Sequence, residues 1–261
     1  MNSVFNFLWK RPLNLFKKKP TVSFCITCRN RLWQLKETLP KNLKDNIGQK
    51  DRVEFVLVDF ASTDGLQEWI RDNFVEELKS GYLKYYYSDE MPQWHMSVAK
   101  NTAHKFAGGE IVVNLDADNF TGPEGGDYVS RKMRIYGPDK VILHMWTGIY
   151  LDGTFGRLVL SKKNFMKFGG YDEKFEVSSY QDTDLRNRVR AGGVKRIRCK
   201  NKKYISAIAN EKGDGVACDT DRWLAMNWRN KALSIKNIEG GRLVANEGMD
   251  IGVNAVRMFY K

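Results

Sequence analysis

Two carboxylates follow an apolar run near the middle of the chain. Asp116 and Asp118 come directly after residues 112–115 and are separated by one small residue, Ala117. In extended backbone, residues two apart project to the same side, so we expect the two carboxylates to converge on one point. Carboxylate oxygens are ligands that Mg²⁺ and Mn²⁺ prefer, and two of them leave coordination positions for nucleotide phosphates. An ordinary polar loop leaving a strand has the same pattern, and this alternative stays open.

A further carboxylate lies at the start of a predicted helix over residues 180–191. Asp182 and Asp184 are two apart, so on a helix they point in different directions and should not share one task. The first helical turn favours the ionised form of Asp182, which suits a general base that accepts a proton from a hydroxyl group. A purely structural interpretation is also open. Ser179 with Asp182, or Ser178 with Gln181, could form a capping box, and Asp184 could pair with Arg188 four residues later.

Strand and helix signals alternate along the chain, which is typical of an α/β layered fold. Strands are predicted over residues 21–27, 53–59, 83–87, 110–115, 141–144 and 157–161. Helices are predicted over residues 32–43 with an interruption near Pro40, and over 65–80, 97–107, 180–191 and 219–237. Ligands bind at the carboxyl ends of the strands in such a sheet, so polar residues that follow strands are candidate site residues.

The first two predicted strands also end in polar residues. Arg29 and Arg31 follow the first strand and could neutralise phosphate, while Asp59 ends the second and could accept hydrogen bonds from a base or ribose. Asp64 comes shortly afterwards. For this residue, capping of the next helix together with Gln67 is at least as good an interpretation as ligand contact.

Length and composition favour one domain with appendages, because 42% of the 261 residues are hydrophobic. The sequence has no apolar run long enough to span a bilayer and no secretory signal, so we expect a cytoplasmic protein. Four scattered cysteines agree with that compartment. Cys25 and Cys28 occupy opposite faces of a predicted strand, which favours buried free thiols over a metal or redox pair.

The net charge of +12 is concentrated in two segments that contain no acid. Residues 1–20 interleave cations with aromatic and aliphatic side chains, so they could lie on an anionic membrane surface or form a loosely packed tail. Residues 185–203 could attract a phosphorylated or acidic acceptor, or a nucleotide. No recognised nucleic-acid-binding module accompanies the charge, so no nucleic-acid partner is expected.

The order of five short motifs resembles that of the family-2-like glycosyltransferases with the GT-A fold, from about residue 21 to about residue 193. The motifs are Cys28-Arg29-Asn30-Arg31, Val58-Asp59-Phe60-Ala61-Ser62-Thr63-Asp64-Gly65, Ser97-Val98-Ala99-Lys100-Asn101, Leu115-Asp116-Ala117-Asp118, and Gly169-Gly170-Tyr171-Asp172-Glu173 leading to Gln181-Asp182-Thr183-Asp184-Leu185. The resemblance implies a single α/β domain with a Rossmann-like, mixed and mostly parallel sheet flanked by helices. It also implies Mn²⁺ or Mg²⁺ as cofactor and a nucleoside-diphosphate sugar as donor, with uridine as the default base.

The same resemblance implies a role for each candidate residue. Asp118 would bind the metal directly, and Asp116 would approach the ribose and the metal. Asp182 would be the base of an inverting transfer to a hydroxyl of a glycan or glycoconjugate acceptor, as in polysaccharide biosynthesis. The remaining residues would contact the nucleotide: Asp59 at the base, and Arg29 or Arg31 and Lys100 near the nucleotide or its phosphates.

Two features depart from the pattern of this family. Gln181 stands where an acid usually precedes the base, and no histidine follows the base helix to complete a metal site. Asn210, Asp214 or water could stand in for that histidine. Trp146 and Tyr150 lie in a stretch where an acceptor sugar could stack, although core packing is an equal alternative.

The expected organisation is a basic N-terminal segment (1–20), a catalytic domain (21–218) and a C-terminal helical extension (219–261). Within the catalytic domain, residues 21–119 would bind the nucleotide and residues 120–218 the acceptor. Two other functions stay open at this point. A sugar-nucleotide pyrophosphorylase has a related sheet, but it should carry a Gly-rich phosphate loop after the first strand. A non-catalytic basic protein that binds nucleic acid or a membrane would explain the charge but not the ordered acids.

Overall fold

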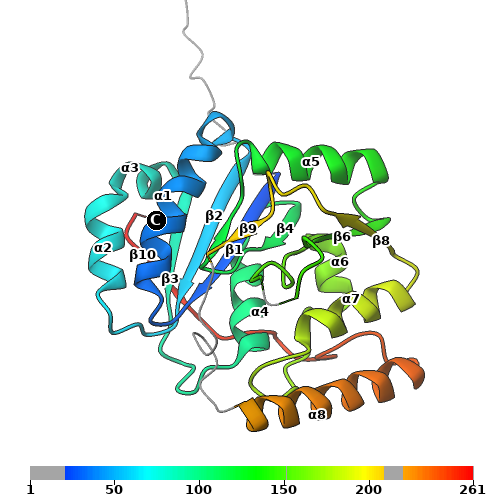
Figure 1. Ribbon diagram of the computed structural model, residues 1–261. Helices are drawn as coiled ribbons and strands as arrows, with labels where there is room; N and C mark the ends of the chain where they lie inside the picture. The colour runs from blue at the N-terminus through cyan, green and yellow to red at the C-terminus, as the bar shows by residue number, and fades with distance from the viewer. Residues whose placement is uncertain (1–20, 151, 209–219, 261) are drawn as a thin grey trace, which may run out of the picture.

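The computed structural model describes residues 21–150, 152–208 and 220–260. Its centre is an eight-stranded sheet in the order β10-β3-β2-β1-β4-β7-β6-β8, in which only β7 and β10 run antiparallel to their neighbours (Figure 1). The strands are β1 (Val22–Cys28), β2 (Val53–Asp59), β3 (Leu83–Tyr87), β4 (Ile111–Asn114), β6 (Val141–Met145), β7 (Leu158–Ser161), β8 (Lys195–Cys199) and β10 (Val256–Met258). A small second sheet pairs β5 (Asn119–Phe120) with β9 (Ser206–Ala207). The predicted mixed, mostly parallel sheet is confirmed.

Helices cover both faces of the large sheet (Figure 1). They are α1 (Leu32–Asp45), α2 (Leu66–Asn73), α3 (Val75–Ser80), α4 (Met96–Phe106), α5 (Gly125–Tyr136), α6 (Lys162–Lys167), α7 (Gln181–Ala191) and α8 (Thr220–Glu239), with a 3₁₀ turn at η1 (Ile47–Gln49). One apolar core lies under α1, α2, α3 and α5, and a second lies under α4, α6 and α7. No helix among the described residues is both long enough and apolar enough to cross a membrane.

Several predicted elements differ from the observed ones. Helix α1 runs unbroken through Pro40, whose ring lies on the exposed side of the helix, so the predicted interruption is wrong. The predicted helix over residues 65–80 is two helices that meet at Phe74. Strand β8 was not predicted, because its Lys-Arg-Ile-Arg sequence is highly charged and lacks the apolar pattern typical of a strand. The basic N-terminal segment 1–20 lies outside the described residues.

The pair Cys25 and Cys28 in β1 is confirmed as two buried free thiols. Cys28 belongs to the core under α1, and Cys25 belongs to the core under α4, so the two side chains leave opposite faces of the strand. Burial raises the pKa of both thiols, which keeps them protonated. Neither residue is therefore a candidate metal ligand or redox centre.

A stripe of buried polar side chains on α1 holds the segment that follows β4. The stripe consists of Gln34, Thr38 and Asn42 on α1 and Asn46 directly after it; their four-residue spacing places them on one side of the helix. Thr38 Oγ1 donates to the Ala117 carbonyl at 2.6 Å, and Asn42 Nδ2 donates to the Asn119 carbonyl at 2.8 Å. Asn46 Nδ2 donates to Thr121 Oγ1 at 2.8 Å. The side chains of α1 thus supply the hydrogen bonds that a neighbouring strand would otherwise give to the backbone after β4.

Replacing Thr38 by valine should weaken this support. The Thr38→Val variant keeps the shape of the side chain but leaves the Ala117 carbonyl without its donor, so we expect a loss of about 1–3 kcal/mol in the free energy of unfolding. Urea denaturation measures this loss. The matched control is Glu37→Gln on the exposed face of α1, which should unfold like wild type. Equal midpoints for wild type and Thr38→Val would show that the bond contributes nothing.

Candidate active site

Asp116 and Asp118 lie in a turn at the carboxyl end of β4, not in the extended backbone that the sequence predicted. The strand ends at Asn114, and the Asn119 amide donates to the Asp116 carbonyl at 2.9 Å, which closes the turn. The Asp116 carboxylate accepts from Asn114 Nδ2 at 3.1 Å, whereas the Asp118 carboxylate accepts from Asn119 Nδ2 at 2.6 Å. The two carboxylates therefore belong to the same turn but have different neighbours.

A buried lysine connects Asp116 to Asp182. Lys100 lies on α4 with its side chain 2% exposed. Its Nζ donates to Asp182 Oδ1 at 2.8 Å and lies 3.7 Å from Asp116 Oδ1. Gly156 borders the same space, because a Cβ atom there would lie 3.1 Å from Asp116 Oδ2 and 3.2 Å from Asp182 Oδ2. The structure thus brings Asp116, Lys100 and Asp182 into one cluster, which we call the carboxylate–lysine cluster.

Asp182 lies in the first turn of α7, as predicted, but it has no capping duty. The residue before the helix is Tyr180, which makes no side-chain cap, so neither predicted capping box forms. Gln181 Nε2 donates to Asp182 Oδ2 at 3.1 Å. Burial raises the pKa of the Asp182 carboxyl group, although the nearby Lys100 opposes the shift. A buried carboxylate with a raised pKa is suited to accepting a proton.

Helix α8 holds the turn that precedes α7. Ser179 and Tyr180 both have positive φ, 76° and 67°, a conformation that costs energy for residues with a side chain. Asn230 on α8 donates to the carbonyls of Ser178 and Ser179, each at 2.9 Å. The Ser179 hydroxyl donates to Asn227 on the same helix at 2.7 Å. These bonds fix the backbone from which α7 starts.

Asp184 serves a structural purpose. It is fully buried, forms the predicted i,i+4 ion pair with Arg188 Nε at 2.7 Å, and accepts from Ser234 of α8 at 2.7 Å. Arg188 also donates to the carbonyls of Phe168 and Gly170, at 2.7 and 2.6 Å. A buried ion pair is favourable only when its remaining hydrogen-bonding groups are satisfied, as they are here. The ion pair thus joins α7 to α8 and to the backbone at Phe168 and Gly170.

The turn at residues 169–173 places an aromatic ring beside Lys100. Tyr171 follows two glycines, and its ring centre lies 5.4 Å from Lys100 Nζ. Asn101 fixes this turn, because its Oδ1 accepts from the Tyr171 amide and its Nδ2 donates to the Tyr171 carbonyl, both at 2.8 Å. A Cβ at Gly169 would lie 1.8 Å from a neighbouring carbonyl oxygen, and one at Gly170 would lie 2.4 Å from Asn101. Only glycine fits these two positions.

The two arginines after β1 have different surroundings. Arg29 donates to the carbonyls of Met91 and Pro92, at 3.0 and 3.1 Å, and is therefore held against the loop after β3. Arg31 is half-buried, and its side chain makes no hydrogen bond or ion pair with the part of the chain that the structure describes. Both arginines lie at the carboxyl end of β1, which is flanked in the sheet by β2 and β4.

Asp59 and Asp64 hold the loop after β2. Asp59 is fully buried, and its two oxygens accept from the Ser62 amide at 2.9 Å and from Tyr85 Oη at 2.6 Å. Asp64 accepts from the Leu32 amide at 2.8 Å, so it caps α1. Helix α2 begins after Gly65 without a side-chain cap, so the capping box predicted from Asp64 and Gln67 is wrong. Asp59 lies at the predicted edge of the sheet but has no exposed surface in this conformation.

The acids of the Asp116–Asn119 turn fit a divalent cation only in part. Among residues 21–150, 152–208 and 220–260, no three His, Cys, Asp or Glu side chains gather as a metal site. Two carboxylates are a suitable donor set for Mn²⁺ or Mg²⁺ if water and substrate phosphates supply the other oxygens. The stand-ins predicted for the missing histidine, Asn210 and Asp214, lie outside the described residues. The metal would therefore depend on Asp118 and Asp116 together with a bound nucleotide.

The connection between β6 and β7 carries an aromatic cluster that leads to Gly156. The ring of Trp146 lies 5.0 Å from that of Tyr150, 5.2 Å from that of Phe155 and 5.5 Å from that of His144. Trp146 is buried, whereas Tyr150 is 73% exposed. Burial lowers the pKa of His144 to about 4, so this residue is neutral near pH 7. The burial of Trp146 agrees with the predicted core packing, and stacking of an acceptor sugar on the exposed Tyr150 stays a prediction.

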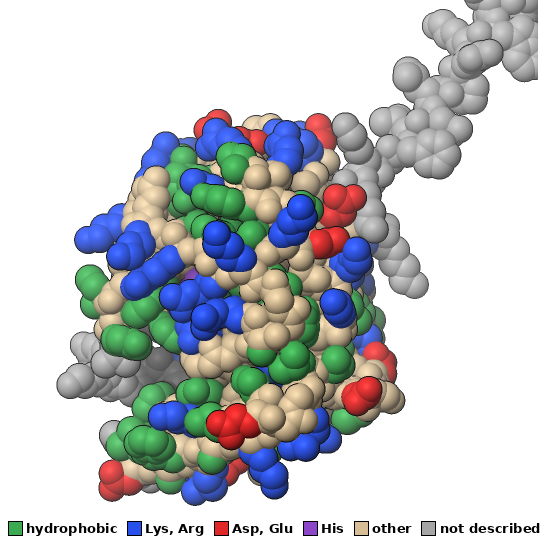
Figure 2. All heavy atoms as spheres, turned by 90° about the vertical axis from the view of Figure 1, so that its right-hand side faces the viewer, with side chains coloured by type: hydrophobic (Ala, Val, Ile, Leu, Met, Phe, Trp, Pro, Cys, Tyr) green, Lys and Arg blue, Asp and Glu red, His purple; other side chains and the backbone are tan. Residues whose placement is uncertain are grey.

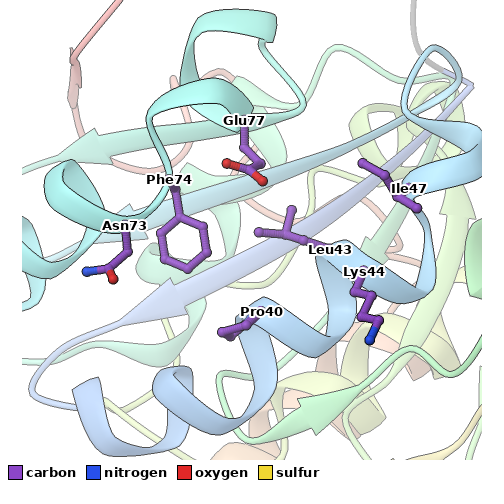
Figure 3. Close-up of a pocket in the computed structure, with 7 residues that line it drawn as sticks. All are labelled: Pro40, Leu43, Lys44, Ile47, Asn73, Phe74 and Glu77. Atoms are coloured by element: carbon purple, nitrogen blue, oxygen red, sulfur yellow. The ribbon is translucent and has the colours of Figure 1, made fainter.

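A groove between α1 and α3 is separate from the carboxylate–lysine cluster. It is lined by Pro40, Leu43, Lys44, Ile47, Asn73, Phe74 and Glu77 (Figure 3). The C-terminal half of α1 faces the edge where the parallel strands begin, because α1 returns from the carboxyl end of β1. The groove is therefore remote from the carboxylate–lysine cluster.

Three residues of the site were missed by sequence reasoning. Gly156 and Tyr171 border the carboxylate–lysine cluster, and Arg157 is buried next to it. Arg157 donates to Asn119 Oδ1 and to the carbonyls of β5 and the β9 region, and burial lowers its pKa to about 10. The available signal was the Gly-Arg pair at the start of the strand predicted over residues 157–161, because an antiparallel strand starts at the edge where its parallel neighbours end.

Comparison with known proteins points to one family. Residues 23–150 match the family described as Glycosyl transferase family 2. No curated protein matches the chain by sequence.

Solved structures share the fold. The mannosyltransferase PcManGT from Pyrobaculum calidifontis, in complex with GDP-Man and Mn²⁺, is 19% identical, with a TM-score of 0.63 over 86% of this chain and 68% of its own. TarS 1–349 from S. aureus, in complex with UDP-GlcNAc, is 17% identical, with a TM-score of 0.61 over 83% and 67%. GalNAc-T7 with UDP, GalNAc and Mn²⁺ is 13% identical, with a TM-score of 0.57 over 70% and 43%. Residues 23–150 therefore match the family 2 glycosyltransferases in sequence, and the chain shares the GT-A fold with these solved structures.

Proposed function

We propose that the protein transfers a sugar from a nucleoside-diphosphate sugar to a hydroxyl of a glycan or glycoconjugate, with inversion and with the help of Mn²⁺ or Mg²⁺. The observation that carries this proposal is the carboxylate–lysine cluster, in which the turn acid Asp116 and the helix acid Asp182 face one space beside Gly156. The family match favours sugar transfer over pyrophosphorolysis or non-catalytic binding. The solved relatives contain both GDP-Man and UDP-GlcNAc, so uridine is the first base to test, followed by guanosine.

In this reaction Asp182 acts on the acceptor. Its carboxylate takes the proton of the attacking hydroxyl while the new oxygen–carbon bond forms at the anomeric carbon and the bond to the diphosphate breaks. One displacement of this kind inverts the configuration. Lys100 holds Asp182 Oδ1, and Gln181 holds Oδ2, so the carboxylate is oriented before the acceptor arrives.

The other end of the site would serve the donor. Asp118 and Asp116 are the residues that would hold the metal ion, which offsets the negative charge that builds on the departing diphosphate. Asp59, Arg29, Arg31 and Lys100 stay our candidates for positioning the nucleotide. In this proposal residues 21–119 form the nucleotide-binding half of the domain and residues 120–218 the acceptor-binding half.

The Asp182→Asn variant tests the proposed base. We assay donor hydrolysis and transfer with a panel of nucleoside-diphosphate sugars and Mn²⁺. Asp182→Asn should bind the donor that wild type binds, but its turnover should fall by about 10²–10⁴-fold because the amide cannot accept the proton. Asp51→Asn, an exposed acid at the opposite edge of the sheet, is the control. Turnover close to wild type in Asp182→Asn would remove this residue from the mechanism. If wild type binds and hydrolyses no donor, the proposed function itself is wrong.

The pH dependence of the reaction tests the link between Lys100 and Asp182. Burial raises the pKa of Asp182 and Lys100 lowers it, so removal of the ammonium group should raise it further. Because the base must be ionised, activity falls as the pH drops through this pKa. In Lys100→Gln the acid limb of kcat/KM should therefore move to higher pH. Lys105→Gln on the same helix is the control. A uniform loss of rate with an unmoved limb would indicate a purely structural role for Lys100.

Removal of the Asp118 carboxylate tests the metal site. In Asp118→Asn the Mn²⁺ concentration that half-saturates donor binding should rise at least about ten-fold, since a neutral amide is a weaker ligand for a hard cation. Titration of donor binding against Mn²⁺, with chelator as the zero point, measures this shift. Asp51→Asn should titrate like wild type. An unchanged Mn²⁺ requirement in Asp118→Asn would exclude it as a ligand.

A further inference from the structure

Three arginines lie near Asp182 and the aromatic cluster. Arg186 lies on α7, and Arg196 and Arg198 lie on β8. Within residues 21–150, 152–208 and 220–260, none of the three forms an ion pair. The fully buried Arg157 and Arg188, by contrast, donate to carbonyl and carboxylate oxygens. We call Arg186, Arg196 and Arg198 the arginine cluster.

The charge of Arg196 acts on Arg186. The pKa of Arg186 is lowered, first by partial burial and then by the charges of Arg196 and Arg190. The Nε atom of Arg186 is buried without a hydrogen-bond partner. The pKa of His144 is lowered mainly by burial, and the charges of all three arginines lower it further. This histidine is therefore neutral and adds no charge to the cluster. Cations held together in this way favour a bound anion.

Aromatic rings hold two of these arginines in place. The guanidinium carbon of Arg198 lies 4.5 Å from the ring centre of Trp146, and that of Arg186 lies 5.5 Å from that of Phe155. Stacking of this kind orients the planar donor fork without using its N–H groups. The cluster is therefore prepared to donate several hydrogen bonds to an oxyanion, beside rings on which a sugar can stack.

The arginine cluster lies on the acceptor side of the proposed reaction. Arg186 comes four residues after Asp182, so both side chains lie on one face of α7. The chain that carries Trp146 and Phe155 continues directly into Gly156, which borders the carboxylate–lysine cluster. In a single displacement the acceptor approaches from the side of the base, and the diphosphate departs on the other side. The cluster is thus placed to meet the acceptor rather than the donor phosphates.

The positive surface continues past the cluster along the β8 edge of the sheet. An open hollow between the end of α7 and the start of β8 is lined by Asn187, Arg190, Ala191, Gly193, Val194, Lys195 and Arg196. Figure 2 looks onto this side of the molecule and shows Lys and Arg side chains gathered over the middle of the face, with hydrophobic side chains beside them. An extended anionic chain could follow this surface away from the reacting hydroxyl.

We propose that the arginine cluster binds an oxyanion of the acceptor, so that the acceptor is an anionic glycan or glycoconjugate bearing phosphate or carboxylate groups. This inference rests on the proposed function, because it assigns the acceptor of the same reaction. The oxyanion lies against Arg186, Arg196 and Arg198, the adjoining sugar stacks on the aromatic cluster, and the reacting hydroxyl points toward Asp182.

Binding of small anionic sugars to the full chain tests this inference. Glucose 6-phosphate, glucuronic acid and glucose are titrated separately by calorimetry, with and without UDP or GDP and Mn²⁺. At least one of the two acidic sugars should bind and glucose should not, and which acid binds distinguishes phosphate from carboxylate. In Arg196→Gln/Arg198→Gln the affinity should fall at least about ten-fold. Lys132→Gln/Lys163→Gln removes the same charge from α5 and α6 and should change it by less than about two-fold.

Several outcomes would overturn the inference. The first is equal binding of all three sugars, or binding of none. The second is an equal loss of affinity in the Lys132→Gln/Lys163→Gln control. The third is displacement of the acidic sugar by UDP or GDP, because this competition would assign the arginines to the donor. Polynucleotide that binds more tightly through the same arginines at physiological salt would also overturn it. A thermal melt establishes that each variant is folded, and Arg186→Gln provides an independent third position. If a donor is hydrolysed but no acidic sugar binds, only this inference fails and the proposed function stands.

Discussion

The ammonium group of Lys100 has almost no access to water, and it is the constraint around which the site is built. A buried cation is costly unless carboxylates offset the loss of hydration, and here two acids from distant parts of the chain do so. Asp116 comes from the turn after β4, and Asp182 comes from the start of α7. The fold must therefore bring one strand end and one helix start to the same point. Tyr171 and Gly156 complete the enclosure without adding charge.

The backbone that presents these groups is irregular, and buried side-chain amides and hydroxyls stabilise it. Thr38 and Asn42 hold the acidic turn from α1, and Asn101 holds the turn that carries Tyr171. Asn230 of α8 holds the strained turn before α7. In each case a regular helix supplies a rigid support, and a short polar side chain reaches across to backbone that has no ladder partner. This explains why a helix late in the chain contributes to a site formed by earlier segments.

The regular elements were predictable because their patterns are local. Strands such as β2 and β3 coincide with runs of apolar and aromatic residues, and the order of the five motifs indicated the fold class. Some errors are local, such as the continuous helix at Pro40, the helix boundary at Phe74 and the charged strand β8. The others concern contacts between segments that are remote in sequence. Asp64 fits a capping box with Gln67, but the amide of Leu32 is its partner. The stripe of polar residues on α1 has a visible four-residue spacing, yet only the position of the acidic turn explains why that face is buried.

The reversed direction of β7 allows the connection before it to vary without changes in the parallel strands. Because β7 runs against β4 and β6, the chain between β6 and β7 is a hairpin connection, and its Gly156 borders the carboxylate–lysine cluster. Its length and sequence can vary without altering the register of the parallel strands that carry Asp59 and precede Asp116. Changes within residues 146–156 can therefore alter the surroundings of Gly156 while the strands that lead to Asp59 and Asp116 keep their pairing.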